Sequence, residues 1–497
     1  MLAKVSSVAI VGMDARPVEV EVNLATGLSD FQIVGLPSAG VREARKRVEA
    51  AIVNSGEQWP QRKITANLAP GDLRKDGPMF DLPLAVGILG ASGRVNPKKI
   101  AGYVVVGELA LDGRLRPVRG VLAVSLEARA GGAKGVVVPA LNASEAGLVP
   151  GVQVFGADHL VDALAFLNGE LQAHDDMPRP ERLLYLDPAP GPDLSDVKGQ
   201  ALARRALEIA AAGGHNVLMV GPPGAGKTML ARRLPGILPP LSVEEALEVT
   251  KVWSVAGLLS AGQPMVTQRP FRSPHHQASA AGVVGGGQTI PRPGEVSLAH
   301  NGVLFMDEFP LFSRAVLEAL RQPLEEGFIT VARQGAAVQF PAHVCLVGAA
   351  NPCMCGRAGD GRALCDCSPG RLDAYRSRLS GPLLDRIDLH VEVGLLTNDE
   401  LMDLDPSEPS SAVRARVIKA RGFKDSREPV RDMAIENLAA GPKHFLSTAL
   451  AHENFSPRGL TRSLRVARTI ADLEGSESID ENHVAEALQF RRGVWDR

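Results

Sequence analysis

Residues 215–234, HNVLMVGPPGAGKTMLARRL, combine the residue types of a phosphate-binding turn in the required order. The apolar run Asn216–Val220 predicts a buried strand of a parallel sheet, and a helix is expected to begin near Lys227. The turn between them fits GxxxxGK[ST], in which glycines let backbone N–H groups surround a triphosphate. The alternative, a glycine turn without a ligand, is disfavoured by this strand–turn–helix order. The expected ATP contacts are Gly221, Pro222, Pro223, Gly224, Ala225, Gly226, Lys227 and Thr228.

Two adjacent carboxylates, Asp307 and Glu308, end a second apolar run, Gly302–Met306. A central strand of this kind delivers its C-terminal end to the nucleotide crevice. We expect Asp307, together with the Thr228 hydroxyl, to hold Mg²⁺, directly or through water. Glu308 is expected to polarise the attacking water. The alternative is that the pair only caps a helix.

Two more residues have the chemistry to complete a hydrolytic site. Asn351 follows the apolar run His343–Ala350, so its side chain can sense the γ-phosphate and orient the water. Arg386 lies in LLDRIDL and has two interpretations. It is either a structural ion-pair partner of Asp385 or Asp388, or a finger that reaches the ATP of a neighbouring subunit.

The 497-residue length is typical of about three domains. A net charge of −2 argues against a uniformly basic surface for nucleic acid. The five cysteines do not resemble a secreted disulfide framework, and no apolar run approaches the ~18 residues of a membrane span. We therefore expect a cytoplasmic protein without a membrane partner.

Composition and periodicity divide the chain into an α/β domain at 1–168, a proline-rich linker at 169–193, a second α/β domain at 194–398 and a helix-rich region at 399–497. In the first domain, Ser38–Asn54 predicts a basic amphipathic helix, whose arginines we interpret as a solvated face rather than a binding patch. The runs that predict strands or continue the α/β pattern are Val5–Val11, Val18–Leu24, Ile64–Leu68, Tyr103–Leu111 and Gly135–Pro139.

The first domain resembles the proteolytic domain of Lon-type proteases, an S5-like α/β fold. The stretches that carry this resemblance are DGPMFDLP at 76–83 and GELALDGRLRPVRGVL at 107–122. In those proteases a serine nucleophile follows Asp-Gly-Pro, and a lysine beyond the later Pro-x-x-Gly activates it. The corresponding residues here are Met79 and Leu122, which can neither attack a carbonyl nor accept a proton. The resemblance therefore implies an inactive domain used for binding or assembly.

The remainder resembles the AAA+ ATPases of the magnesium-chelatase-like branch, through GPPGAGKT, LFMDE, the Asn-Pro strand end and LLDRIDL. RPFRSPHH (269–276), VGGGQTIPRPGEVSLAHNGVLFMDE (284–308) and AANPCMCG (349–356) resemble the YifB/ComM family, and the likeness spans the chain. It implies a P-loop α/β/α core with a helical lid, in homo-hexameric rings with ATP sites between subunits. It also implies that Arg386 is the trans-acting finger and that Arg458, or its rival Arg462, is a lid sensor.

Two insertions lie between the nucleotide motifs. Residues 269–298 lack helical periodicity and are expected to form a loop or hairpin facing a ring channel. His275 and His276 within them are interpreted as polar anchors rather than metal ligands, because no Cys or acidic partner is nearby in sequence. Residues 329–340 predict a two-stranded hairpin. Arg333 near its tip is a candidate DNA phosphate contact or, equally, a plain solvated arginine.

Four cysteines are concentrated in fifteen residues as two Cys-x-Cys pairs. Such pairs can provide a tetrahedral thiolate site for Zn²⁺, although the Cys-x₂-Cys spacing is commoner. The alternative is four reduced thiols in a loop. Cys345, in an apolar run, is expected to be a core residue. The candidate zinc ligands are Cys353, Cys355, Cys365 and Cys367.

The family resemblance implies an ATP- and Mg²⁺-dependent motor acting on single-stranded or branched DNA, as a branch-migration helicase in recombination during natural transformation. A magnesium-chelatase motor subunit is the first alternative, but this alternative leaves the first domain, residues 1–168, unexplained. We expect no porphyrin partner. A protease would need a nucleophile that Met79 cannot supply. A protein-remodelling ATPase without DNA remains a further alternative, because no motif directly reads nucleic acid.

Overall fold

The structure is a computed structural model of the 497-residue chain. It describes all residues except 175–176, 185–190, 261, 288–290, 334–335, 359–363, 398–399, 401, 403–406, 426–437, 453–456 and 492–497. Within helices and strands, the side chains of residues 333, 336, 424–425, 448–452 and 457–458 also lie outside the description.

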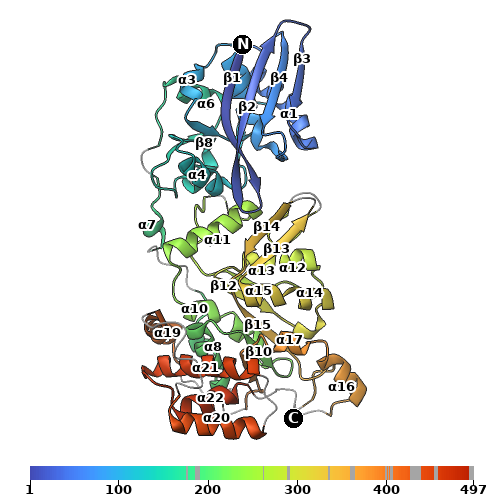
Figure 1. The fold of residues 1–497 in the computed structure, drawn as a ribbon, viewed down its shortest axis with the longest axis vertical. Helices are drawn as coiled ribbons and strands as arrows, with labels where there is room; N and C mark the ends of the chain where they lie inside the picture. Colours follow the sequence, from blue (N-terminus) through green and yellow to red (C-terminus); the bar gives the residue numbers. More distant parts are fainter. Residues whose placement is uncertain are drawn as a thin grey trace.

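The molecule is elongated, with an α/β unit at its N-terminal end, a second α/β unit in the middle and a helical bundle at the far end (Figure 1). Asn168 ends the helix α6, and the described part of the proline-rich segment contains one short helix, α7 (Pro180–Leu184). The mixed α/β class with a helical C-terminal region is as the sequence predicts. The domain limits at 168, 193 and 398 stay predictions.

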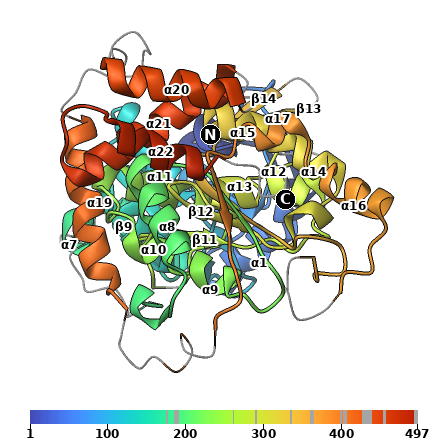
Figure 2. The same ribbon diagram turned by 90° about the horizontal axis from the view of Figure 1, so that it is seen from below.

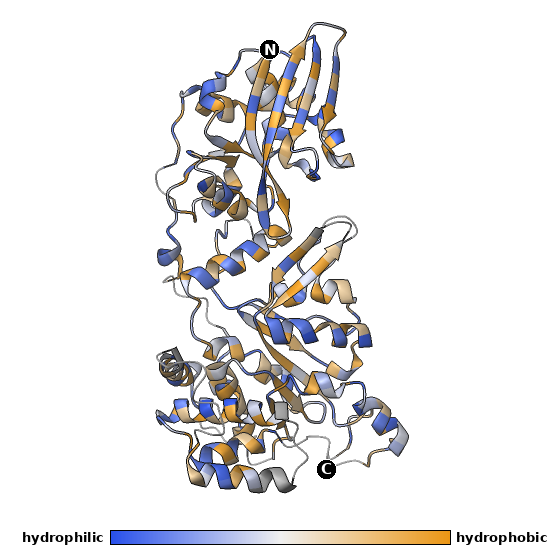
Figure 3. Ribbon diagram, in the orientation of Figure 1, coloured by the Kyte–Doolittle hydropathy of each residue, from blue (hydrophilic) through white to orange (hydrophobic). Residues whose placement is uncertain are grey.

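The first unit is built on a seven-stranded sheet in the order β3-β4-β2-β1-β5-β8-β9. Buried and exposed residues alternate along much of β1 and β2. The strands of this unit correspondingly carry alternating hydrophobic and hydrophilic colours in Figure 3. This period-2 pattern places one apolar face against the helices. The strands are β1 (Leu2–Val11), β2 (Asp14–Ala25), β3 (Asp30–Val34), β4 (Lys63–Ala69), β5 (Tyr103–Val105), β8 (Gly135–Pro139) and β9 (Gln153–Ala157), with a small hairpin of β6 (Glu108–Leu109) and β7 (Leu115–Arg116).

The helices of the first unit differ in how they meet this sheet. The predicted basic helix forms as α1 and begins where Ser38 caps the backbone N–H of Val41. The helix α2 is apolar and buried on all sides, so it has no amphipathic period to detect. The helices are α1 (Ala39–Asn54), α2 (Asp81–Ala91), α3 (Pro97–Ile100), α4 (Val121–Ala130), α5 (Ala143–Ala146) and α6 (Leu160–Asn168).

The second unit has a five-stranded parallel sheet in the order β11-β12-β15-β10-β16. β10 and β12 are buried along their whole length, as expected of a sheet covered on both faces. The strands are β10 (Val217–Val220), β11 (Phe271–Arg272), β12 (Gly302–Met306), β15 (Val344–Ala350) and β16 (Leu389–Glu392), and β13 (Phe328–Arg333) pairs with β14 (Ala336–Pro341) as the predicted hairpin.

Short helices connect these strands, and the prediction of a plain loop or hairpin for residues 269–298 was wrong. That segment contains β11, which joins the main sheet, and the helices α12 and α13. Each of these helices is too short to display a helical period in the sequence. The helices are α8 (Ala201–Gly213), α9 (Lys227–Ala231), α10 (Leu234–Ile237), α11 (Val243–Ala256), α12 (Ala280–Val284), α13 (Glu295–Leu298), α14 (Arg314–Ala319), α15 (Arg321–Glu326), α16 (Pro369–Arg376) and α17 (Gly381–Leu384).

The C-terminal bundle lies beside the second unit, and its helices are grouped together in the view from below (Figure 2). Both α19 and α21 pack against α8, which makes the bundle continuous with the core around β10. No helix in the described parts of the chain has the length and apolarity needed to cross a membrane. The helices of the bundle are α19 (Ser410–Asp425), α20 (Ala440–His452), α21 (Pro457–Glu474) and α22 (Glu481–Gln489).

Candidate nucleotide site

The order of the parallel strands brings three sequence motifs to one edge of the sheet. β15 lies between β12 and β10, and all three run in the same direction. Their C-terminal ends therefore meet at the same edge. The glycine-rich turn follows β10, the carboxylates follow β12, and Asn351 follows β15.

The glycine-rich turn adopts backbone conformations that require glycine. Gly224 and Gly226 have φ values of 80° and 89°, in the left-handed region. At Gly221 a Cβ atom would lie 2.0 Å from the carbonyl oxygen of Val393, so no larger residue fits there. Glycine is therefore required at these positions of the turn, which leads directly into α9.

The Lys227 ammonium group lies over this turn. Its Nζ donates to the carbonyl oxygens of Gly221 at 2.5 Å and Pro222 at 2.9 Å, and to Oδ1 of Asn351 at 3.2 Å. Burial lowers the pKa of Lys227, while the charge of Asp307 opposes this shift. Its partners are neutral oxygens, so a phosphate anion is a stronger partner for the same cation. The turn thus fits a triphosphate.

The Thr228 hydroxyl and the Asp307 carboxylate face each other. Thr228 Oγ1 donates to Asp307 Oδ2 at 3.1 Å, and the backbone N–H of Glu308 donates to Asp307 Oδ1 at 2.9 Å. A hydroxyl and a carboxylate supply the hard oxygen ligands that Mg²⁺ prefers. These two residues fit the predicted magnesium site.

Glu308 has an unusual backbone and a partner that the sequence did not reveal. Its φ is 50°, which is uncommon for a residue with a side chain. Its Oε2 lies 2.8 Å from Nδ1 of His276. The expectation that His276 has no acidic partner was therefore wrong, because it considered only neighbours along the chain. No residue pattern indicates this pairing, since it depends on β11 lying beside β12.

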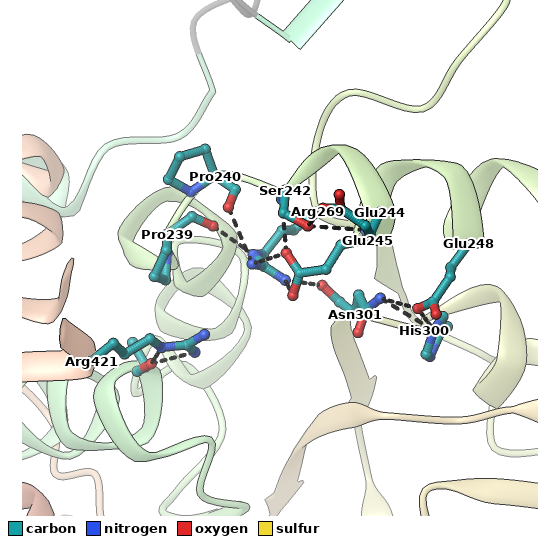
Figure 4. Close-up of polar contacts among 11 residues, drawn as sticks. Pro239, Pro240, Ser242, Glu244, Glu245, Glu248, Arg269, His300, Asn301 and Arg421 are labelled. Atoms are coloured by element: carbon teal, nitrogen blue, oxygen red, sulfur yellow. Dashed lines mark hydrogen bonds and ion pairs between the residues drawn. The ribbon is translucent and has the colours of Figure 1, made fainter. Parts of the chain in front are cut away.

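The segment that carries His276 is anchored at its start by Arg269, as Figure 4 shows. The largely buried guanidinium of Arg269 donates to the carbonyl oxygens of Pro239 at 2.6 Å and Asn301 at 2.7 Å, and to Oε2 of Glu245 at 2.8 Å. Charge-assisted hydrogen bonds of this kind are worth about 1.5–3 kcal/mol each. Arg269 thereby joins the start of this segment to the first turn of α11.

Arg386 lies at the opposite edge of the sheet from the glycine-rich turn. It precedes β16, and its carbonyl oxygen accepts from Asn216, which precedes β10. Its buried side chain pairs with Glu325 of α15 and donates to the carbonyl oxygen of Pro382. The suggested intrachain partners, Asp385 and Asp388, were therefore wrong. Arg386 does not reach the nucleotide residues of its own chain.

The two candidate lid sensors lie in α21. Arg462 Nη1 is 2.7 Å from Asp388 Oδ1, at the N-terminal end of β16. Burial opposes ionisation of Asp388, but the hydrogen bond with His215 and the charge of Arg462 hold its pKa well below the usual range. Arg462 is therefore engaged away from the glycine-rich turn. The side chain of Arg458 lies outside the described residues.

The four clustered cysteines come together in space. Their sulfur atoms all lie within 4.8 Å of one another, and none forms a disulfide. Cys355 and Cys365 are ten positions apart in the sequence, but their sulfur atoms lie 3.6 Å apart. The sulfur atoms of Cys365 and Cys353 lie 3.7 Å apart. Four thiolates around a tetrahedral zinc, with Zn–S bonds of about 2.3 Å, have sulfurs about 3.8 Å apart. The cluster therefore fits the predicted zinc site.

The predicted DNA contact Arg333 and the two protease positions, Met79 and Leu122, lie away from the nucleotide residues in the sequence. Arg333 ends β13, but its side chain lies outside the described residues. The adjoining hairpin packs against the first unit, where Val338 and Met13 share a buried cluster. In the first unit, Met79 and Leu122 are both buried and belong to separate hydrophobic clusters.

A magnesium-chelatase-like AAA+ module is defined by three features together: the glycine-rich turn, the carboxylates after β12 and the strand order. Three family models agree: residues 193–401 match magnesium chelatase subunit ChlI, residues 20–142 match subunit ChlI of Mg-chelatase, and residues 407–491 match the C-terminal region of that subunit. The chain belongs to the YifB/ComM family of these proteins. Membership implies the use of ATP and Mg²⁺.

Full-length relatives carry this assignment. The protein YifB of Salmonella typhimurium is 44% identical over 500 residues, which cover 99% of this chain and 97% of the relative. Competence protein ComM of Haemophilus influenzae is 44% identical over 509 residues, 99% of this chain and 98% of the relative. The 38 kDa magnesium-chelatase subunit of Rhodobacter capsulatus is 26% identical over 306 residues, 58% of this chain and 83% of that subunit.

Proposed function

We propose that the protein is an ATP-hydrolysing motor that acts on DNA as a branch-migration helicase. The observation that carries the hydrolytic part is the meeting of the glycine-rich turn, Asp307, Glu308 and Asn351 at one sheet edge. The alternative use of such a motor, proteolysis, has no support, because Met79 and Leu122 occupy the positions of the nucleophile and its activating lysine.

Each residue of this edge has a distinct role in the proposed reaction. The glycine-rich turn and Lys227 bind and neutralise the phosphates, and Thr228 and Asp307 provide oxygen ligands for the metal. Mg²⁺, when bound, offsets negative charge on the phosphate oxygens. Glu308 accepts a proton from the attacking water, and Asn351, already hydrogen-bonded to Lys227, orients that water.

The ATP site is proposed to be completed by a second copy of the chain in a homo-hexameric ring. Arg386 lies away from the nucleotide residues of its own chain, which supports a role in the site of a neighbour. An arginine contributed in trans stabilises the negative charge of the transition state. In the isolated chain Arg386 is paired with Glu325, so assembly has to exchange this partner for a phosphate.

The proposed track is single-stranded or branched DNA in the cytoplasm. Its support is the name of the Haemophilus influenzae relative, a competence protein that matches along its whole length. Migration of a DNA branch is the step that consumes ATP in this proposal. Arg333 in β13 and the segment 269–298 are the candidate DNA contacts.

The four-cysteine cluster is proposed to bind Zn²⁺. Gly356 supports a role for this site at the nucleotide: a Cβ there would lie 2.8 Å from the ring of Pro223, so the cysteine loop touches the glycine-rich turn. Cys353 also follows Asn351 by two residues. A bound zinc would therefore fix the loop that carries the water-orienting asparagine against the phosphate turn.

The proposal is tested by measuring steady-state ATP hydrolysis by the purified protein with and without forked DNA. We expect Mg²⁺-dependent turnover that rises severalfold when forked DNA is added, because assembly on DNA brings Arg386 to the neighbouring site. ATP hydrolysis that does not respond to DNA would support the ATPase activity and refute the proposal that the motor acts on DNA. Absence of turnover under both conditions would refute the motor itself.

A further inference from the structure

Within the described residues, the side-chain partner of the Glu308 carboxylate is the imidazole of His276. Nδ1 of the ring lies 2.8 Å from Oε2, and both side chains are partly exposed, 27% for His276 and 49% for Glu308. A half-exposed glutamate without such a partner can occupy several rotamers. The ring therefore selects where this carboxylate points.

The register of the sheet explains why these two residues meet. Arg272 of β11 pairs with Leu304 of β12 in parallel register. His276 and Glu308 each follow these partners by four positions along the chain. The loops after two neighbouring parallel strands leave the same edge of the sheet. The contact between His276 and Glu308 is thus a consequence of the strand pairing.

Two contacts hold the loop that bears His276. Before the loop, Arg272 makes a bidentate pair with Glu295, at 2.6 and 2.8 Å, and lies over the ring of Trp253. His276 itself lies in a turn that is closed by a hydrogen bond from the N–H of Ala278 to the carbonyl oxygen of His275 at 2.8 Å. An imidazole on such a loop can restrain the carboxylate that it contacts.

The Glu308 backbone adds a reason for this restraint. Its φ of 50° is a conformation that costs a residue with a side chain about 1–3 kcal/mol and persists only where the surroundings impose it. The peptide N–H of Glu308 is already committed to Asp307 Oδ1. His276 restrains the other end of Glu308, the side-chain carboxylate.

We propose that His276 is a positioning residue for the catalytic base, an inference that rests on the proposed ATPase function. With its Nδ1–H donated to Oε2, the ring leaves Oε1 of Glu308 to accept the proton of the attacking water. Because His276 belongs to the segment 269–298, the same contact joins a candidate partner-binding segment to the hydrolytic site.

The test compares His276→Ala with His276→Asn in steady-state ATP hydrolysis. We expect His276→Ala to lower kcat about tenfold or more without changing KM for ATP, because a misplaced base slows the chemical step while Lys227 and Thr228 still bind nucleotide. The amide nitrogen of His276→Asn can take the position of Nδ1, so this variant is expected to recover most of the lost rate. A purely structural role would be lost in both variants.

The matched control is His174→Ala, which removes an exposed imidazole of the first unit, away from the nucleotide residues and from the segment 269–298. We expect its kcat to stay close to that of the wild type. A second control places His276→Ala in the Glu308→Gln background, where it should slow turnover no further.

The outcomes separate the inference from the function on which it rests. A wild-type protein that hydrolyses ATP, with a His276→Ala variant of equal or higher kcat, would overturn the positioning role alone. Additive losses in the double variant would overturn it as well, because His276 would then act elsewhere. A wild-type protein without turnover would overturn the proposed function and this inference together.

Discussion

The ammonium group of Lys227 connects two of the three motifs before any nucleotide is considered. It donates to Gly221 and Pro222 in the glycine-rich turn and to Asn351 at the end of β15. Thr228 and Asp307 make the corresponding contact between the turn and β12. Donors and ligands held in this way need little rearrangement when phosphate arrives, which is the condition for electrostatic stabilisation.

Glu308→Gln is the residue-scale prediction. The amide keeps the size of the side chain but cannot accept a proton from water, so ATP should still bind while hydrolysis falls about 100-fold or more. Nucleotide binding can be followed with a fluorescent ATP analogue, and hydrolysis by phosphate release. Turnover close to that of the wild type would remove Glu308 from the role of base.

At this scale the sequence predicts roles from local motifs and misses those that depend on pairing. The glycines, Lys227 and Asp307 follow from spacing along the chain, and the structure brings them together. His276 contacts Glu308 only because β11 lies beside β12, an order that no motif encodes. The intrachain partner of Arg386 was missed for the same reason, since Glu325 comes from α15.

The cysteine loop is the element that bears most directly on the nucleotide site. It begins immediately after β15, and its Gly356 packs against Pro223 of the glycine-rich turn. Tyr375 of α16 is buried beside it, and burial raises the pKa of this phenol to about 12. The loop therefore contacts the glycine-rich turn through Gly356.

Metal analysis of the purified protein tests the zinc proposal. We expect about one zinc per chain, lost when Cys353 and Cys365 are both replaced by Ser, because two thiolates cannot retain a structural zinc. The matched control is Cys345→Ser, which changes a buried cysteine outside the cluster. Protein without zinc, or a double variant that keeps its zinc, would refute the site.

How well the sequence predicted a helix or strand depended on the length of that element and on whether its apolar residues recur at a regular spacing. The long strands and α1 have clear patterns, and the structure contains them. The short α12 and α13 were hidden, because a helix of one turn shows no periodicity. α2 was hidden for the opposite reason, since a helix that is apolar on all sides has no face to detect.

Across the whole molecule, α11 links the two α/β units. On one side, Lys251 pairs with Asp14 at 2.7 Å and Ser254 donates to the buried Glu145, whose pKa is raised by burial. On the other side, Glu245 binds Arg269 at the base of the segment that carries His276. α11 therefore connects the segment that carries His276 to the first unit through these contacts.

The ring is proposed for several copies of the chain together. The sequence indicates a second subunit only through the family resemblance, and the structure adds that Arg386 does not reach its own nucleotide residues. Two sites on neighbouring copies, each lacking an arginine until they meet, would make hydrolysis depend on assembly. DNA that promotes assembly would then control the motor.

The most direct test of the account is a strand-exchange measurement on synthetic DNA. Purified protein is incubated with labelled three- and four-stranded junctions, and the separation of the strands is followed with ATP, without ATP, and with the Glu308→Gln variant. The account predicts that branches move only with ATP and wild-type protein. An ATP-hydrolysing protein that leaves both junctions intact would contradict the claim that this motor drives branch migration.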